Sequence, residues 1–354
     1  MMFPEEPPLV IPVHNLGAGG NTPPYWLEPP QGLGWKYAMF NAYFLRNVER
    51  IPYPVKAWID SGAFLFIETY QRELAGTHGK RRLGTRSWSE DLVIEVLKIQ
   101  ERLGAEVAFT LDYPLPPQSQ VDECCPDEVL KRMKLTAKAA GIAFQMKTRN
   151  IKIFPVLQFN SYENLKVMLA LLEAELKSRA GVGLDEVDGL AIGGLVPHSG
   201  KWWLVVKRLQ ELRRLVGWEV RVHLLGVASP QNVPLFFYAG ADSMDSKTFI
   251  ISAAKRLYYL PLGKGRARIE LKAELPKDSC NCPVCSNHDL EELREKTKLL
   301  TLHNLYVMLD SAKKARELCF SGQLKHFLLA MAKASPRVAK ALRFSPKGRR
   351  CKDV

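Results

Sequence analysis

The stretch 187–226, VDGLAIGGLVPHSGKWWLVVKRLQELRRLVGWEVRVHLLG, decides the fold class. It contains two short apolar runs, at 187–194 and 220–226, and between them a segment with the period of an amphipathic helix, at 201–217. A helix between two apolar strands is the pattern of a parallel strand pair joined by a crossover helix. The segment 201–217 also carries several basic residues, which predict a basic outer face for this helix.

The same alternation extends in both directions along the chain. Further strands are predicted at 9–14, 35–40, 56–60, 105–112, 151–158 and 241–246, and further helices at 87–104, 126–149, 161–180 and 229–240. Together with the two strands above, this makes roughly eight, the number in a (β/α)8 TIM barrel. An open doubly wound sheet is the alternative. It is less favoured because no glycine-rich dinucleotide or phosphate motif follows the first strand.

Polar residues or glycines close several of the predicted strands: Asp60, Asp112, Gln158, Gly193–Gly194 and Asp245. One polar residue at a strand end is an ordinary turn signal. In a barrel, however, the C-terminal ends of all strands converge on one mouth, where the active site lies. Five such ends, three of them aspartates, therefore predict a constellation of site residues.

The charge of the chain points to a polyanionic partner. Its 354 residues carry a formal net charge of +13, and such a field favours nucleic acid. The basic stretch HGKRR (78–82), the helix at 201–217 and the tail from Ser321 are predicted to hold phosphates by non-specific charge. The alternative is a basic enzyme whose charged surface is simply solvated.

The N-terminal segment MMFPEEPPLVIPVH has two glutamates where a signal peptide carries positive charge, and it lacks a long apolar core. No stretch of the chain approaches the ~20 apolar residues of a membrane helix. We therefore expect a cytoplasmic protein that makes no membrane contact, in a compartment that keeps its cysteines reduced.

The strand–helix alternation stops near residue 262, and the chain is predicted to contain three parts. Residues 1–262 form the barrel with the active site, residues 263–320 form a zinc-binding subdomain with closing helices, and residues 321–354 form a basic helix and tail. The end of the tail, SPKGRRCKDV (345–354), is expected to fray.

Three cysteines in the second part predict a metal site. Cys280, Cys282 and Cys285 form a C-x-C-x2-C motif, which supplies three corners of a Zn²⁺ tetrahedron. The fourth ligand is His288 or His303. His303 is favoured, because an inward imidazole on the apolar helix LLTLHNLYVML without a ligand would be a buried polar group. Four protein ligands make a closed, structural Zn²⁺ site, whereas the alternative is three reduced cysteines in a loop.

Taken together, these motifs resemble the tRNA-guanine transglycosylase superfamily. The matching segments occur in family order: FNAYFL (40–45), DSGAF (60–64), LGAEVAFTLDYPLPP (103–117), PVLQFNSYENL (155–165), AIGGLVP (191–197), VHLLGVASP (222–230), GADSMDS (240–246), CNCPVC (280–285) and TLHNLY (301–306). Each segment alone is weak, but the ordered set is specific. The chain departs from the family at Leu65, in place of glutamine, and at Phe159, in place of glycine.

The resemblance implies exchange of guanine in a nucleic acid for a 7-deazaguanine base. It implies Asp245 as the nucleophile on C1′, Asp60 as the general acid–base, and Asp112 as the acceptor of guanine N1–H and 2-amino protons. Four further residues are expected to bind the base on its O6 side: Gln158, Gly193, Gly194 and Leu195. The Gln158 amide and the backbone N–H groups of Gly194 and Leu195 would donate to O6. Three carboxylates around one pocket should raise the pKa of at least one of them. Asp242, at odd spacing from Asp245, is interpreted as structural.

The polymer is the least constrained part of this interpretation. The chain looks most like the paralogous branch that inserts deazaguanines into DNA, so DNA is favoured and tRNA is the alternative. A non-catalytic nucleic-acid-binding subunit of the same fold and a barrel hydrolase acting on sugars are rival hypotheses. The three aspartates argue against the first, and the charge and the cysteine motif argue against the second. The sequence leaves open whether a homodimer or a partner subunit completes the site.

Overall fold

The computed structural model describes residues 9–14, 16, 35–67, 86–115, 126–262, 268–270, 280–345 and 348–349. The predicted basic stretch 78–82 and the N-terminal eight residues lie outside this described part of the chain.

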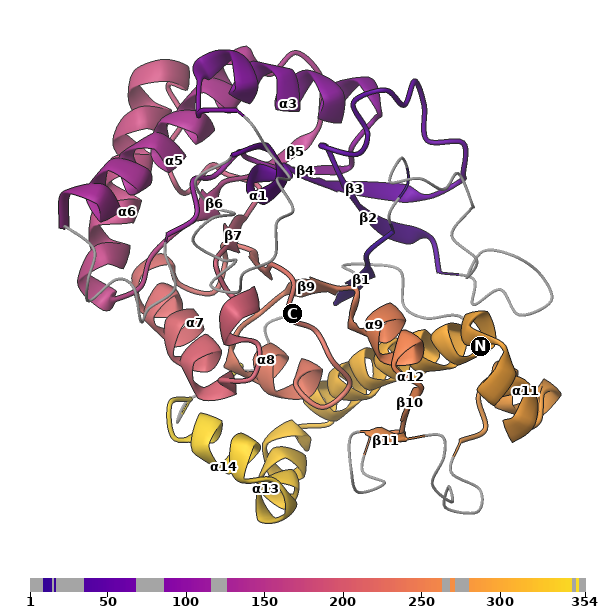
Figure 1. Ribbon diagram of the computed structural model, residues 1–354. Coiled ribbons are helices and arrows are strands. Elements are labelled where there is room, and N and C mark those ends of the chain that lie inside the picture. Colours follow the sequence, from indigo (N-terminus) through magenta and orange to yellow (C-terminus); the bar gives the residue numbers. More distant parts are fainter. Residues whose placement is uncertain are drawn as a thin grey trace.

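The centre of the molecule is a closed barrel of parallel strands (Figure 1). Its strands are β1 Val10–Pro12, β2 Tyr37–Asn41, β3 Lys56–Asp60, β4 Val107–Phe109, β5 Lys152–Phe154, β6 Val156–Leu157, β7 Leu190–Ile192, β8 Val222–Leu224 and β9 Ser243–Ser246. From β2 to β5 and from β6 to β9, each strand pairs with the next in sequence order. Only Pro155 separates β5 from β6, because proline has no N–H for the strand ladder. The two therefore act as one strand.

Two contacts close the circle. β1 pairs in parallel with β9 through Ile11 and Asp245. Val13, just after β1, forms a parallel bridge with Met39 of β2. With β5 and β6 counted as one, eight strands form the described barrel, so the predicted (β/α)8 fold is confirmed and an open sheet is excluded.

Helices surround the barrel (Figure 1), and those at 90–102, 126–146, 162–180, 202–216 and 233–239 follow the predicted positions. They are α3 Glu90–Arg102, α5 Pro126–Met146, α6 Tyr162–Ala180, α7 Trp202–Val216, α8 Val233–Ala239 and α9 Thr248–Ala254, with the short α1 Ala63–Phe66 and the 3-10 helix η2 Val196–His198. Serine side chains fix two of the starts: Ser89 accepts the N–H of Leu92, and Ser161 accepts that of Asn164.

Aromatic rings from four strands fill the barrel interior. Trp58 of β3 lies 6.0 Å from Phe109 of β4 and 5.9 Å from Phe154 of β5, measured between ring centroids. His223 of β8 completes the group, at 5.5 Å from Trp58 and 4.8 Å from Phe109. Since Trp58 and Asp60 are two residues apart on one strand, they share the inward face, with Asp60 nearer the mouth.

The C-terminal elements are β10 Leu257–Tyr259, β11 Arg268–Glu270, α10 Pro283–Asn287, α11 Leu290–Glu295, α12 Thr297–Phe320, α13 Leu324–Ala334 and α14 Pro336–Leu342. The long helix α12 packs against α8 and α9 of the barrel (Figure 1). Next along the chain, α13 packs on α8 and α14 on α7. The division into parts at residues 262 and 320 stays a prediction.

The prediction of a basic outer face on α7 is wrong for two of its arginines. Arg208 and Arg213 are buried, Arg213 with bonds to the carbonyls of Gly240 and Val220, and α14 packs against α7. The ring of Trp203 on α7 lies 5.5 Å from that of Phe344, and the Lys340 ammonium lies 4.8 Å from the Trp203 ring centroid. Part of the basic tail therefore packs on the barrel.

The expectation that the chain end frays is also wrong at Arg349. The backbone N–H of this residue donates to the carbonyl of Tyr238 at 2.8 Å, and its guanidinium donates to the carbonyl of Ala241 at 3.1 Å. The same guanidinium forms an ion pair with Asp242, and lies 4.6 Å from the Phe237 ring centroid. These contacts come from residues more than a hundred positions away, so local composition does not reveal them.

Candidate active site and metal centre

The three predicted aspartates converge at the mouth of the barrel. Asp60 is the last residue of β3, Asp112 follows β4, and Asp245 lies within β9. Burial of its carboxyl group, and then the negative charges of Asp112 and Asp245, raise the pKa of Asp60 to about 7. The pKa of Asp112 is raised to about 6, chiefly by burial. The predicted pKa elevation is thus found for Asp60 and Asp112.

The Asp245 carboxylate is held by one of its two oxygens. Its Oδ1 accepts the backbone N–H of Gly226 at 2.8 Å and the Nε2–H of His223 at 3.1 Å. Because a carboxylate has no proton to give, His223 must donate from Nε2, and its Nδ1 then accepts the hydroxyl of Ser243 at 2.8 Å. Within the described residues, Oδ2 of Asp245 has no hydrogen-bond partner, so it is available to a substrate.

His223 is a site residue that sequence reasoning missed. It is fully buried and contacts Asp245, the proposed nucleophile, directly. The signal was one histidine in the run VRVHLLG, which also contains Arg221. That signal shows neither the direction of the imidazole nor its partner, since both depend on pairing with β9.

Asp112 and Gln158 form a hydrogen-bonded pair. The Nε2 amide of Gln158 donates to Oδ2 of Asp112 at 2.6 Å, and the hydroxyl of Ser61 lies 3.5 Å from Oδ1. Both Asp112 and Gln158 are buried. Oε1 of Gln158 accepts the N–H of Leu115 at 3.4 Å, which orients the amide.

The glycine turn after β7 lies against this pair. A Cβ atom on Gly193 would collide with the Gln158 amide nitrogen, so glycine here lets the amide keep its position. Gly194 has a φ of +65°, in the left-handed region that favours glycine. Neither Gly194 nor Leu195 donates its N–H to another described residue, which leaves both groups open to a ligand oxygen.

Asp60 is positioned from two sides. Its Oδ2 accepts the side-chain amide of Asn41 at 3.0 Å and the N–H of Gly62 at 3.3 Å. Gly62 has a φ of +75°, and a Cβ atom there would collide with Asn41, so the turn after β3 requires glycine. Asn41 ends β2 and is a further positioning residue that the sequence did not identify as such.

Asp242 faces away from the mouth, as the odd spacing predicted. It accepts the backbone N–H of Val222 at 2.7 Å and forms ion pairs with Arg213 and Arg349. Asp242, just before β9, and Asp245, within β9, therefore point to opposite sides. Asp245 belongs to the site, whereas Asp242 joins the barrel to the C-terminal segment.

The predicted metal ligands form one cluster. The candidate ligand atoms of Cys280, Cys282, Cys285 and His303 all lie within 4.8 Å of one another. Nδ1 of His303 is 3.4 Å from the sulfur of Cys282 and 3.2 Å from that of Cys285. Its Nε2–H donates to the carbonyl of Tyr259 at 2.9 Å, which leaves the Nδ1 lone pair facing the thiols.

These four residues could hold a metal ion, and His303 rather than His288 lies in the cluster. His288 instead contacts Glu292, with 3.0 Å between its Nδ1 and the carboxylate. The ring of Tyr258 stacks on His303 at 3.8 Å and covers the cluster. A Cys3His set can hold a metal with no open position. Which metal it holds is not fixed by these distances.

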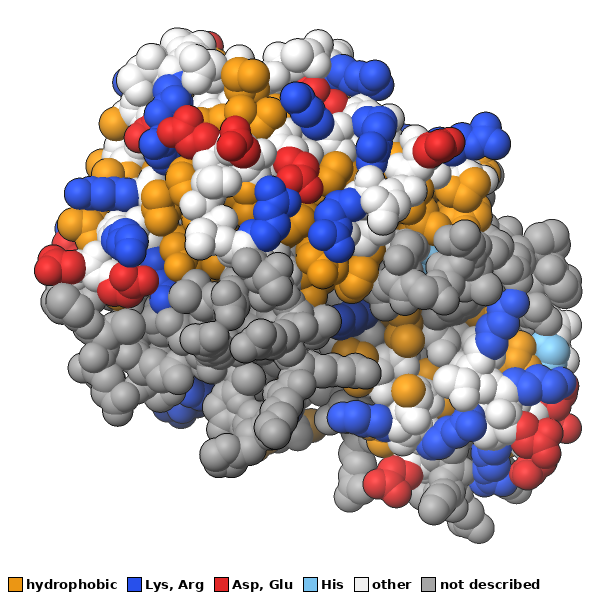
Figure 2. Space-filling model, turned by 45° about the horizontal axis from the view of Figure 1, so that its top comes forward, with side chains coloured by type: hydrophobic (Ala, Val, Ile, Leu, Met, Phe, Trp, Pro, Cys, Tyr) orange, Lys and Arg blue, Asp and Glu red, His pale blue; other side chains and the backbone are white. Residues whose placement is uncertain are grey.

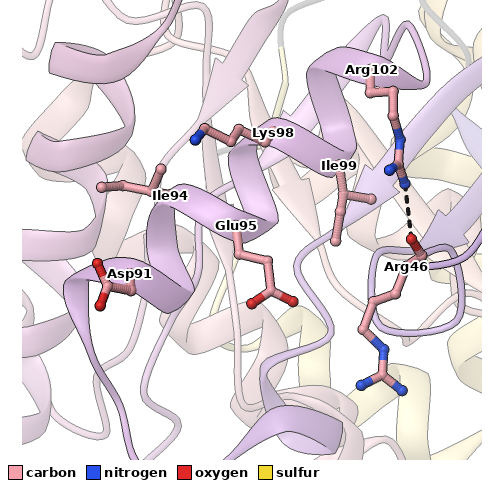
Figure 3. A pocket seen from close by; sticks show the side chains of 7 residues that line it. All are labelled: Arg46, Asp91, Ile94, Glu95, Lys98, Ile99 and Arg102. Atoms are coloured by element: carbon pink, nitrogen blue, oxygen red, sulfur yellow. Dashed lines mark hydrogen bonds between the residues drawn. The ribbon is translucent and has the colours of Figure 1, made fainter.

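A separate surface pocket of about 590 Å³ lies between α3 and the segment after β2 (Figure 3). Its lining carries both charges: Arg46, Asp91, Ile94, Glu95, Lys98, Ile99 and Arg102. Arg102 donates to the carbonyl of Arg46 at 3.1 Å across one end. None of the predicted site residues lines this pocket.

Basic residues do not gather into a single patch on the face shown in Figure 2, where Lys and Arg side chains alternate with Asp and Glu over the described residues. In the described part of the chain, no helix combines the length and apolarity that crossing a bilayer requires.

The chain has a closed parallel barrel with three carboxylates at its mouth and a separate Cys3His cluster. This arrangement places it in the class of (β/α)8-barrel enzymes, whose active sites lie at the C-terminal strand ends. Within that class, the family model for queuine tRNA-ribosyltransferase matches residues 57–337, and the chain belongs to this family. The resemblance inferred from the ordered motifs is thereby confirmed.

Several curated archaeal proteins named tRNA-guanine(15) transglycosylase are similar to this chain. The protein of Aeropyrum pernix is 25% identical over 334 residues, and that of Methanopyrus kandleri is 25% identical over 339 residues. These alignments cover 89% and 93% of this chain, but only 58% and 67% of the relatives. The protein of Pyrococcus furiosus is 28% identical over 251 residues, which is 69% of this chain and 39% of the relative.

Proposed function

We propose that this chain is a guanine transglycosylase that exchanges a guanine base in tRNA for a 7-deazaguanine base. The main support is the convergence of Asp60, Asp112 and Asp245 on one barrel mouth in a member of this family. The sequence analysis favoured DNA as the polymer. The names of the similar proteins favour tRNA instead. A cytoplasmic location agrees with a tRNA substrate and with the free thiols of Cys280, Cys282 and Cys285, although Cys319 is disulfide-bonded.

The first step is a displacement at C1′ of the target nucleotide. The free Oδ2 of Asp245 attacks C1′, the bond from C1′ to the base nitrogen breaks, and its electron pair leaves with the guanine. Asp60, protonated near neutral pH because of its raised pKa, gives its proton to the departing base. The sugar is then held as an ester of Asp245.

The second step reverses the first with a different base. Asp60, now a carboxylate, removes the proton from the incoming 7-deazaguanine nitrogen, which attacks C1′ and releases Asp245. A carboxylate suits both steps because it is a nucleophile and a leaving group, as in retaining glycosidases. In this proposal His223 and Gly226 hold Oδ1 so that Oδ2 faces the sugar.

Guanine recognition uses the opposite side of the pocket. The Asp112 carboxylate accepts the paired donors at N1 and the 2-amino group. The backbone N–H groups of Gly194 and Leu195 donate to O6. The Gln158 amide already donates to the Asp112 carboxylate. It can donate to guanine O6 only if the bound base breaks this hydrogen bond and the amide turns.

The cluster of Cys280, Cys282, Cys285 and His303 is proposed to hold one structural Zn²⁺. Bound metal would fix β10, α10 and α12 together, since the ligands come from the loop and helix α10 and from α12, while Tyr259 of β10 accepts from His303. It takes no part in the exchange.

A competition assay tests the function and the polymer together. Equal nucleotide amounts of total tRNA and genomic DNA are mixed with the protein and labelled guanine or 7-deazaguanine base. Label is expected in tRNA and absent from DNA. Label in DNA alone would restore the DNA interpretation, and label in neither polymer with either base would contradict base exchange.

A further inference from the structure

Two buried polar side chains near the mouth lack partners. Arg208 of α7 is 4% exposed, and His198 at the end of η2 is 6% exposed. Nε of Arg208 and Nδ1 of His198 are both fully buried and make no hydrogen bond to any described residue. Arg208 also forms no ion pair within the described part of the chain, although nearly all buried charges in proteins are paired.

Both residues lie beside the proposed guanine pocket. His198 follows the glycine turn, three residues after Leu195, and the Arg208 guanidinium lies 6.0 Å from the ring centroid of Phe159, the residue after Gln158. Helical side chains lean toward the N-terminus of their helix, and α7 begins at the mouth end of the barrel. Arg208 therefore reaches toward the mouth from the outer layer of helices.

The local charge is positive, and the attraction of Glu211 offsets it only in part, without an ion pair to Arg208. Burial lowers the pKa of Arg208 to about 10, so the guanidinium stays charged at neutral pH. Burial, and then the charges of Arg208 and Lys201, lower the pKa of His198 to about 4, so this imidazole is neutral. The nearest acid on α7 is Glu211, one turn along, which makes its closest ion pair with Lys207 at 3.8 Å.

We propose that Arg208 and His198 form a binding site for a phosphate group, and that the group is a phosphodiester of the nucleic acid strand next to the exchanged nucleotide. A guanidinium presents paired N–H donors that match two phosphate oxygens, and a neutral imidazole supplies one more donor. A phosphate would form an ion pair with the buried guanidinium, which makes none with any described residue. The assignment to a nucleic acid strand rests on the proposed function, whereas the phosphate site itself does not.

The first test uses inorganic phosphate and the full chain. Thermal unfolding is measured in phosphate and in chloride at equal ionic strength for wild type, Arg208→Met and Arg214→Met. Arg214 is an exposed arginine on the same helix, so it matches the charge change without touching the site. Phosphate is expected to raise the unfolding temperature of wild type and Arg214→Met, and to leave Arg208→Met unchanged.

The second test separates a phosphodiester from a free phosphate. Binding of tRNA is measured across a salt series, and the slope of log K against log[salt] is compared. Each lost phosphate contact lowers this slope by about 0.7–0.9. Arg208→Met should lose one such contact relative to wild type, whereas Arg214→Met should keep the wild-type slope.

Each outcome decides something. If Arg208→Met keeps the phosphate protection and the salt slope, Arg208 is a structural arginine and the site is overturned. If the protection is lost but the slope is unchanged, the phosphate site stands and its assignment to the polymer is overturned. If wild type exchanges no base on any polymer while Arg208→Met still loses the phosphate protection, the proposed function fails and the phosphate site survives.

Discussion

Asp245 and Asp242 show how three positions in one strand separate chemistry from stability. Asp245→Asn removes the attacking carboxylate while the amide still fits beside His223 and Gly226. We expect exchange to fall by on the order of 10³-fold or more. The covalent adduct with the polymer, visible on denaturing gels, should also disappear, with little change in unfolding temperature.

Asp242→Asn is the matched control for Asp245→Asn. It weakens ion pairs to Arg213 and Arg349 that are largely buried, so a cost of about 3–5 kcal/mol in the free energy of unfolding is expected. At a temperature where the variant is folded, its exchange rate should stay near that of wild type. Near-normal turnover in Asp245→Asn would rule out this nucleophile.

The raised pKa values of Asp60 and Asp112 predict the pH dependence of exchange. Asp112 must be ionised to accept guanine donors, so kcat/KM should rise through about pH 6. Asp60 must be protonated to release guanine, so kcat/KM should fall through about pH 7. A pH–rate profile that stays flat from pH 5 to 8.5 would contradict these roles. Because close carboxyl groups titrate as a set, the two apparent pKa values belong to the group of carboxylates together.

Stability gives an independent check on Asp60. Its folded-state pKa lies above the usual value of 3.8, so between about pH 4 and 7 the folded state binds more protons than the unfolded state. Stability contributed by this group is therefore lost as pH rises through that window. Asp60→Asn should flatten the fall in unfolding free energy from pH 5 to 8, measured by urea denaturation.

At the scale of elements, local sequence patterns were sufficient to predict most of the strands and helices of the barrel. Apolar runs and helix periodicity placed the strands and helices, because each pattern is set by which face of one element is buried. The strand-end rule then brought Asp60, Asp112, Gln158 and Asp245 to one mouth. It did not reveal His223 or Asn41, whose roles depend on side-chain direction across neighbouring strands.

The tail shows the opposite limit of sequence reasoning. Its composition suggested a free basic extension, since charge and amphipathic period are visible locally. What α14 and Arg349 pack against is decided by Trp203, Phe237 and Asp242, which are distant in sequence. Long-range contacts of this kind have no local signature.

The metal cluster yields a prediction at the level of helix α12. His303→Ala should lose bound zinc, measured by elemental analysis, because it removes one of four ligands. Metal-binding energy on the order of 10 kcal/mol is folding energy in such sites, so protease digestion should release the region after residue 262. His288→Ala should keep one zinc per chain and resist digestion. The reverse pattern would move the fourth ligand to His288.

At the scale of the whole molecule, Arg349 joins the last described residues of the chain to the outer face of the barrel. Its ion pair with Asp242, together with the bonds to Ala241 and Tyr238, ties the C-terminal segment to α8 and β9. Arg349→Met should therefore lower the free energy of unfolding by about 2 kcal/mol, the usual worth of hydrogen bonds to a charged group. Arg343→Met removes an exposed charge from the same segment and should change stability by less than about 0.5 kcal/mol. Urea denaturation of both variants measures the difference.

Since Arg213 still pairs with Asp242, Arg349→Met should leave the exchange rate unchanged. Equal stability of the two variants would show that the C-terminal segment is not anchored through Arg349.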